Sequence, residues 1–199
     1  MAHLQHGTLT DAMRAEQAKS VKPGDATVAP EESHSSLVAE RGETLALLGQ
    51  AEGENEIGRL GGYRILRQLG QGGMGAVFEA EDLKLERRVA LKVMKPEIAK
   101  HKGHRERFLR EAKTAAKVES DYICPIYQVG EENGVPFIAM PFLKGEPLDV
   151  RLKRGSITLA EAVRIAKEVA EGLSAAHEAH LIHRDIKPGN IWLETQRSG

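Results

Sequence analysis

The sequence predicts an α+β fold, in which a part rich in strands precedes a helical part. Three short runs of strand character lie between residues 63 and 94: "YRILRQL", "AVFEAED" and "RRVALKVM", separated by Gly-rich or charged turns. A helical pattern over residues 105–118 follows them and places apolar residues on one face: Phe108, Ala112, Ala115 and Val118. Because strands come first and helices later, with one helix embedded among the strands, the pattern is typical of the α+β class.

A second hairpin and a long helix complete this pattern. The run "IYQVGEENGVPFIAMPF" predicts two strands around a turn at Glu132-Asn133-Gly134. Thr158 and Glu161 form a capping box at the start of a helix that extends to about Ala176. One face of this helix is apolar and consists of Leu159, Val163, Ala166, Ala170 and Leu173.

Residues 1–60 differ in composition from the rest of the chain. They hold few aromatic or β-branched residues and many Ala, Glu, Ser and Gly. A stretch such as "KPGDATVAPEESHSS" buries too little apolar surface to offset its ordering entropy. The sequence therefore predicts a mostly disordered tail over residues 1–60, with one transient helix at "LTDAMRAEQA" or "SLVAERGETLALLGQ".

Charge and composition exclude several classes of function. With 28 Lys and Arg against 29 Asp and Glu, the net charge is −1, so no basic field favours nucleic acid. Cys124 is the only cysteine, which excludes an internal disulfide and suits a reducing compartment. The start of the chain lacks a signal peptide, and no run approaches the roughly eighteen apolar residues of a membrane span. We therefore expect a cytoplasmic location for these residues, which leaves open a membrane anchor beyond residue 199.

The glycine-rich stretch "LGQGGMGAVFEAED" is the first candidate binding element. It contains Gly70, Gly72, Gly75 and Val77 in the pattern G-x-G-x-x-G-x-V. In a dinucleotide-binding fold these glycines would open a helix. Here an apolar run of strand character follows instead. The sequence therefore favours a glycine loop between two antiparallel strands, whose backbone N–H groups approach a triphosphate.

A lysine in the apolar strand "VALKVM" needs an explanation, because burying an ammonium without a partner is costly. One alternative is that Lys92 lies on an edge strand and extends its ammonium to water. The other is that Lys92 points into a cleft and holds the α- and β-phosphates. This second reading requires a carboxylate partner, and Glu111 lies on the helix face of Phe108 and Ala115. Glu106 is the alternative carboxylate, but its position on the helix predicts a solvated charge on the surface.

Four motifs then follow one another in a fixed order: the glycine loop at 70–77, Val89-Ala90-Leu91-Lys92, Glu111 in "RFLREA", and "HRDIKPGN" at 183–190. Together they resemble a bacterial Hanks-type (eukaryotic-like) serine/threonine protein kinase from about Tyr63 to Gly199. The resemblance implies a two-lobed kinase fold with a complete N-lobe and only the first part of the helical C-lobe. It predicts a partial kinase domain over 63–199, with the N-lobe and hinge at 63–143 and the start of the C-lobe, including the catalytic loop, at 144–199.

The resemblance also implies roles for residues of the loop "HRDIKPGN". Asp185 would accept the proton of the substrate hydroxyl and orient its oxygen toward the γ-phosphate. Lys187 would steady the γ-phosphate, and a lysine at this place indicates Ser/Thr as the acceptor. Asn190 would supply an oxygen ligand to Mg²⁺. ATP and Mg²⁺ are thus the implied cofactors, and proteins with Ser or Thr are the implied substrates.

An adenine pocket is implied in the same way. Pro141 stands where an acidic residue is usual, but it keeps the C=O that accepts from the adenine amino group. Leu143 retains the N–H for the ring nitrogen. Trp192 takes the place of the medium aliphatic floor, and either stacks on adenine or fills the core. The remaining apolar positions are the roof and the gatekeeper: Leu69, Val77, Ala90 and Met140.

The family pattern continues to an Asp-Phe-Gly, whose aspartate chelates the principal Mg²⁺. In this sequence "IWLE" reads as the first strand of a hairpin and "TQRSG" as its turn, and no Asp-Phe-Gly follows within the 199 residues. We therefore expect a truncated kinase, and expect residues 1–199 alone to be inactive and poorly stable.

Three functions compete on the sequence alone. An active Ser/Thr kinase in the parent protein is the first, and a nucleotide-binding regulatory module or pseudokinase scaffold is the alternative. Intact Lys92, Glu111, Asp185 and Asn190 argue against the alternative. A small-molecule kinase is a third reading, which the Ile186-Lys187-Pro188 context makes less favoured. A dimer formed through the N-lobe is a candidate assembly.

Overall fold

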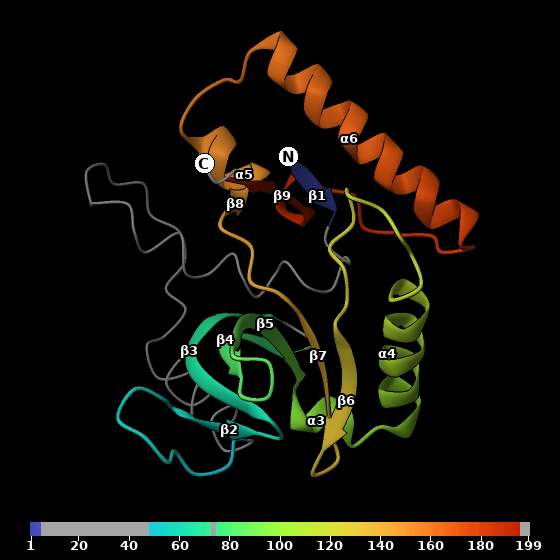
Figure 1. Cartoon of the computed structure of the whole chain (residues 1–199). Coiled ribbons are helices and arrows are strands. Elements are labelled where there is room, and N and C mark those ends of the chain that lie inside the picture. Colours follow the sequence, from blue (N-terminus) through green and yellow to red (C-terminus); the bar gives the residue numbers. More distant parts are fainter. Residues whose placement is uncertain (5–47, 73–74, 196–199) are drawn as a thin grey trace, which may run out of the picture.

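A computed structural model describes residues 1–4, 48–72 and 75–195 of the chain. These residues form two lobes (Figure 1). The lower lobe in this view holds a six-stranded sheet, with α4 beside β6 and β7. The upper lobe holds a three-stranded sheet, α5 and the long helix α6. The prediction of an α+β fold is thus confirmed.

The six-stranded sheet is antiparallel throughout, and its alternating side chains build two separate cores. One face of the sheet carries Ile65, Phe78 and Leu91, and the opposite face carries Val77 and Ala90. Each of the three predicted strands between residues 63 and 94 is present. The strands follow one another across the sheet as β2 (Gly58–Leu60), β3 (Tyr63–Gln71), β4 (Gly75–Asp82), β5 (Arg87–Met94), β7 (Val135–Pro141) and β6 (Gln128–Glu132).

The hairpin between β6 and β7 follows the predicted turn. Glu132 lies opposite Val135, and the two residues between them have positive φ, 51° at Asn133 and 78° at Gly134. An Asn-Gly pair adopts this conformation readily, which is why it closes two-residue hairpins.

Two helices follow β5. The short α3 (Pro96–Ala99) begins with a proline at its first turn, where no N–H is needed. Helix α4 (Lys102–Ala115) starts three residues before the pattern at 105–118 and ends three residues before it. It buries the predicted face of Phe108, Ala112 and Ala115, so this part of the core was correctly anticipated.

The upper lobe begins after β7. Strand β8 (Gly145–Pro147) leads into α5 (Leu148–Lys153), and the 3-10 turn η2 (Pro188–Asn190) leads into β9 (Ile191–Glu194). Helix α6 (Leu159–Glu178) starts at the predicted cap, where the Glu161 N–H donates to Thr158 Oγ1 at 3.2 Å. No helix in the described ranges combines the length and apolar character needed to cross a bilayer.

The packing face of α6 differs from the apolar stripe seen in the sequence. Leu159 is 81% exposed and Val163 is 59% exposed. The residues that α6 buries are Ile165, Gly172 and Ala176, on another side of the helix. The physical reason is that α6 packs on the strand formed by residues 2–4, and Gly172 allows this strand to approach closely.

The prediction of a disordered tail over residues 1–60 needs correction at both of its ends. Residues Ala2–Leu4 form strand β1 of the three-stranded sheet, in the order β1-β9-β8. Residues Gly58–Leu60 form β2, beside which the buried carboxylate of Glu56 binds Arg59 and Arg64, each at 3.0 Å. The transient helix predicted at 9–18 lies outside the described residues, as does that at 36–50 except for its last three residues.

Candidate active site

The glycine-rich stretch forms the end of the β3–β4 hairpin. Gly70 lies opposite Val77, and the Gly72 N–H donates to the Gly75 carbonyl oxygen at 2.8 Å. Gly75 is also required by packing, because a Cβ there would collide with the carbonyl oxygen of Val93 on β5. The predicted flap between antiparallel strands is thus confirmed, and the helix of the dinucleotide-binding alternative is not formed. Residues 73–74 lie outside the described ranges.

Lys92 lies in the middle of the sheet. Its strand, β5, is flanked by β4 and β7, where Val77 and Ile138 are its neighbours. The side chain is only 1% exposed, and its Nζ lies 5.8 Å from the centre of the Phe108 ring. The alternative of an edge-strand lysine that extends to water is therefore wrong. By alternation along β5, Lys92 shares the face of Ala90 and Met94.

The predicted apolar pocket residues come together in one cluster. Four of them come from the N-lobe sheet, whereas Trp192 comes from β9 in the other lobe. Pro141 ends β7 opposite Val89, and Leu143 packs on the rim of the cluster. The predicted pocket residues in this cluster are Leu69, Val77, Ala90, Met140 and Trp192.

The loop at 183–190 is built around the carboxylate of Asp185. Lys187 Nζ lies 3.0 Å from Asp185 Oδ2. Asn190 Nδ2 donates to the same Oδ2 at 2.8 Å and to the Asp185 carbonyl oxygen at 2.6 Å. His183 Nδ1 accepts from the Asp185 N–H at 3.3 Å. Asn190 is completely buried, so this set of contacts fixes the loop beside β9.

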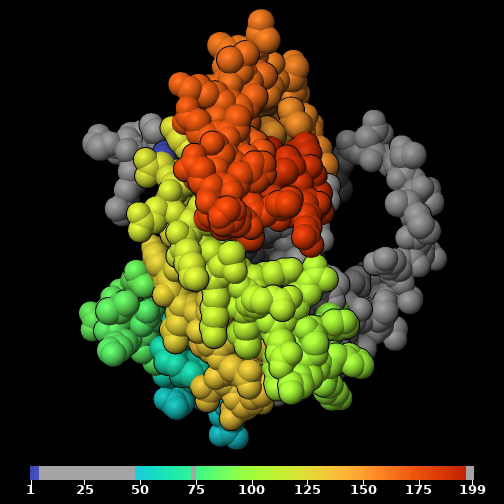
Figure 2. All heavy atoms as spheres, turned by 90° about the vertical axis from the view of Figure 1, so that its right-hand side faces the viewer, coloured from blue at the N-terminus to red at the C-terminus, as the bar shows by residue number. Residues whose placement is uncertain are grey.

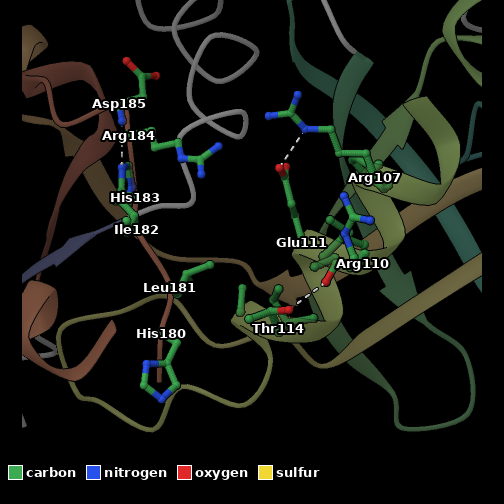
Figure 3. Close-up of a pocket in the computed structure, with 15 residues that line it drawn as sticks. Arg107, Arg110, Glu111, Thr114, His180, Leu181, Ile182, His183, Arg184 and Asp185 are labelled. Carbon is green, nitrogen blue, oxygen red and sulfur yellow. Dashed lines mark hydrogen bonds and ion pairs between the residues drawn. The ribbon is translucent and has the colours of Figure 1, made fainter. Parts of the chain in front are cut away.

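Glu111 does not contact Lys92 in this structure. Its carboxylate binds the Arg107 guanidinium one helical turn earlier, at 2.8 Å between Oε1 and Nε (Figure 3). About half of each side chain is exposed. The expectation that Glu111 lies on the sheet-facing side of the helix is therefore wrong. Phe108, Ala112 and Ala115 fill that side, and Glu111 projects beside it.

A cavity of about 600 Å³ separates α4 from the segment 180–185. Polar residues of α4 and the segment 180–185 face each other across it (Figure 3). In Figure 2 the same arrangement appears from outside, with α4 in yellow-green below the red segment that follows α6. Glu111 and Asp185 thus lie on opposite walls of one cavity.

Comparison with known protein families identifies the family of this chain. The model of the protein kinase domain matches residues 63–198. The chain belongs to this protein kinase family. Among solved structures, the PknI kinase domain of Mycobacterium tuberculosis matches 74% of this chain with a TM-score of 0.63 and 30% identity, and 60% of the PknI chain is covered.

Curated relatives of this kinase chain are bacterial serine/threonine-protein kinases. PknD of Mycobacterium tuberculosis is 44% identical over 134 residues, which are 67% of this chain and 20% of PknD. The probable kinase pknA2 of Bifidobacterium longum is 42% identical over 145 residues, 69% of this chain and 19% of the relative. PknH of Mycobacterium bovis is 43% identical over 132 residues, which are 66% of this chain and 22% of PknH. The chain therefore spans about a fifth of the length of these relatives.

Asn190 is the residue of this loop that could hold a metal ion. The Asn190 nitrogen is committed to Asp185, so Asn190 would bind a metal through its amide oxygen. Among the described residues, no group of three or more His, Cys, Asp or Glu could hold a metal ion. A single amide oxygen is compatible with Mg²⁺, because this ion usually takes most of its ligands from phosphate and water when it is bound beside a nucleotide.

The contacts of Asp185 lower the pKa of its carboxyl group. The hydrogen bond from Lys187 is the largest cause; burial opposes it as the second-largest effect, and the hydrogen bond from Asn190 adds to the lowering. The carboxylate therefore stays ionised, and the Lys187 pair is retained, until the pH falls below the ordinary range for an aspartate.

We expect Lys187→Met to raise the pKa of Asp185, because the main cause of its depression is removed. The measurement is an NMR titration of the Asp185 carboxyl carbon in the wild type and in Lys187→Met. Lys144→Met, at a lysine outside this loop, is the control and should leave the titration unchanged. An unchanged Asp185 titration in Lys187→Met would show that the ion pair has no influence on this carboxylate.

Some residues that line this cavity were not predicted from the sequence. Arg107 is the clearest, although its i, i+4 spacing from Glu111 is a visible signal. Arg110 and Thr114 continue the same polar strip along α4 and line the cavity. This strip lies beside the apolar one, and Glu111 belongs to it.

Proposed function

We propose that a protein containing this chain transfers the γ-phosphoryl group of ATP, with Mg²⁺, to serine or threonine hydroxyls of proteins. The observation that carries the proposal is the binding of one carboxylate, Asp185, by Lys187 and Asn190 in a single loop. Phosphoryl transfer needs positioning and charge neutralisation more than covalent chemistry, and this loop supplies both.

Each polar group has a place in the proposed reaction. Asp185 accepts the hydroxyl proton and aims the oxygen in line with the γ-phosphate. Lys187, which is paired with Asp185, would steady the γ-phosphate. When bound, Mg²⁺ neutralises phosphate charge, with Asn190 as one oxygen ligand. The backbone of the glycine hairpin covers the phosphates, and Lys92 holds their oxygens.

In the proposed kinase, the ion pair between Glu111 and Arg107 belongs to the inactive state. Kinases require the strand lysine and the helix glutamate to be paired during transfer. Helix α4 would therefore turn to exchange Arg107 for Lys92 as the partner of Glu111. The exposed Arg107 pair is weak enough for such an exchange, since surface ion pairs contribute about 0–1 kcal/mol.

A nucleotide-binding scaffold without catalysis is the second candidate, and the pairing of Glu111 with Arg107 is the observation that favours it. The two candidates differ in the effect of Arg107→Ala. In a regulated kinase this change releases Glu111 and raises activity, whereas in a scaffold no activity appears with either residue. A dimer through the N-lobe stays a prediction.

We expect autophosphorylation of a protein extended through the Asp-Phe-Gly segment to yield phosphoserine or phosphothreonine. The reason is Lys187, which the family resemblance links to these acceptors. Phosphoamino-acid analysis after incubation with labelled ATP is the measurement, and Asp185→Asn is the control that should remove the label. A product that is mainly phosphotyrosine would contradict the proposed acceptor.

A further inference from the structure

Helix α4 and the two residues after it carry an excess of positive charge. Residues 102–117 hold six Lys or Arg and two Glu, whereas the net charge of the whole chain is −1. Phe108, Ala112 and Ala115 occupy the buried side of the helix. The charged side chains therefore lie on the outer side of α4, which is the yellow-green surface in Figure 2.

Carboxylates neutralise three of these six cations. The ion pairs are Lys102–Glu106 at 3.7 Å, Arg105–Glu131 at 3.8 Å and Arg107–Glu111 at 2.8 Å. Within the described ranges, no carboxylate forms an ion pair with Arg110, Lys113 or Lys117. These three cations are therefore not neutralised by the folded part of the chain.

The three remaining cations, Arg110, Lys113 and Lys117, form what we call the cation stripe. Spacings of three and four residues place them on the same side of the helix. The Lys117 N–H donates to the Thr114 carbonyl oxygen at 3.2 Å, so the helical course continues as far as Lys117. All three side chains are exposed and border a shallow groove, whose one acidic member, Glu106, is already paired.

An acidic segment of the same chain is complementary to the cation stripe. Residues 25–47 lie outside the described ranges, and their sequence holds five Asp or Glu against one Arg. Two of the acidic residues, Glu31 and Glu32, are adjacent, and the apolar pair Leu37-Val38 follows them. The segment thus combines the charge that the stripe lacks with apolar side chains.

The attachment of the chain on both sides of this segment allows it to reach α4. The Leu4 N–H donates to the Tyr122 carbonyl oxygen at 2.7 Å, shortly after the end of α4. The Gly49 N–H donates to the Arg59 carbonyl oxygen at 2.7 Å, beside β2. The 17 residues from Glu32 to Gly49 span roughly 55 Å when extended. This length is ample for a domain whose radius of gyration is about 13 Å per 100 residues.

We propose that the acidic segment 25–47 of this chain binds the cation stripe, with Glu31 and Glu32 pairing with Lys113 and Lys117. The half-buried Leu109, which lines the groove, offers an apolar contact to the segment. Single ion pairs at a surface are weak and screened by salt. Attachment within one chain compensates for this weakness, because it keeps the segment at an effective concentration of about millimolar.

Binding at the cation stripe does not require kinase activity, but it bears on the proposed function. Glu111 lies on the same helix, next to Arg110, and the proposed exchange of its partner requires α4 to turn. A bound segment must follow this movement or dissociate. Occupation of the stripe and the choice of partner by Glu111 are therefore coupled.

A spin label on the segment tests the contact in the chain of residues 1–199. Ser35→Cys supplies the labelling site, since burial raises the pKa of Cys124 to about 12 and keeps that thiol unreactive. We expect the nitroxide to broaden the amide signals of Lys113 and Lys117. The broadening should fall at least about fivefold between about 0.1 M and about 1 M salt, because the screening length falls from about 10 Å to about 3 Å. Absence of broadening at the lower salt concentration would overturn the proposal.

Charge reversal tests whether the stripe is the binding surface. Lys113→Glu combined with Lys117→Glu should remove the broadening. Lys84→Glu combined with Lys153→Glu makes the same change in net charge at two exposed lysines elsewhere, and should retain it. Unchanged amide signals of β4 and β5 show in each variant that the sheet is folded. Broadening that persists in the stripe variant would contradict binding through these cations.

An exchange of charges provides the last test. Glu31→Lys and Glu32→Lys should remove the broadening in the otherwise unchanged chain, and should restore it when Lys113→Glu and Lys117→Glu are also present. Failure to restore it would contradict direct pairing between these residues. A mixture of spin-labelled chain with isotope-labelled chain that lacks the nitroxide should show no broadening. Broadening in this mixture would assign the segment to a second copy and overturn binding in cis.

Discussion

Replacing Lys92 by methionine should lower phosphoryl transfer by several orders of magnitude in a protein extended through the Asp-Phe-Gly segment. The ammonium is buried on the face of β5 that carries Ala90 and Met94, where methionine keeps the length of the side chain but supplies no charge to the phosphates. The measurement is steady-state transfer from ATP to a generic protein acceptor.

The fold should survive this change. Methionine has nearly the same length as lysine and is compatible with the apolar cluster on this face of β5, so the six-stranded sheet should still form. Lys84→Met, at an exposed lysine in the turn after β4, is the matched control and should retain full activity. Near-wild-type transfer in Lys92→Met would remove the central element of the proposed mechanism.

A polypeptide of residues 1–199 should show no measurable transfer. The metal-binding aspartate of the Asp-Phe-Gly motif is not among these residues, and the neutral amide of Asn190 neutralises none of the metal's charge. Glu111 is bound to Arg107 and not to Lys92, so the second requirement is unmet as well. The assay compares this polypeptide with the extended protein at equal concentration, and robust turnover by residues 1–199 would show that the added segment is dispensable.

The same polypeptide should also be unevenly stable. Leu159 and Val163 leave apolar surface in water on α6, at a loss of about 25 cal/mol per Å² relative to burial. The six-stranded sheet has apolar clusters on both faces. Hydrogen exchange should therefore be slower in β4 and β5 than in α6, and equal protection would contradict this ranking.

Local patterns were sufficient to predict most of the N-lobe. The strand-like run "RRVALKVM" predicted β5, and the spacing of Phe108, Ala112 and Ala115 predicted the buried face of α4. The predicted pocket residues Leu69 and Trp192 also come together, because ordered motifs carry the resemblance that places them. In each case the signal lies within one short segment or one motif.

Long-range pairings were not predictable in this way. Strand β1 has three residues, too few for a periodic pattern, and its partners lie near the opposite end of the sequence. The composition around it predicted disorder instead. Because β1 was missed, the face of α6 that packs on it was also missed, and the most apolar stripe was chosen over the one with Gly172. The partner of Glu111 depends on how α4 is rotated about its own axis. The spacing of residues along the sequence does not fix this rotation to better than about one residue.

Trp192 is the only tryptophan among the 199 residues, and it is buried where residues of both lobes meet. Its indole N–H finds no hydrogen-bond partner among the described residues, so the chromophore lies in an apolar environment. The chain therefore carries its own optical probe. Tryptophan fluorescence with an emission maximum at short wavelength would report the closed interface. A red shift of this maximum would report water entering between the lobes.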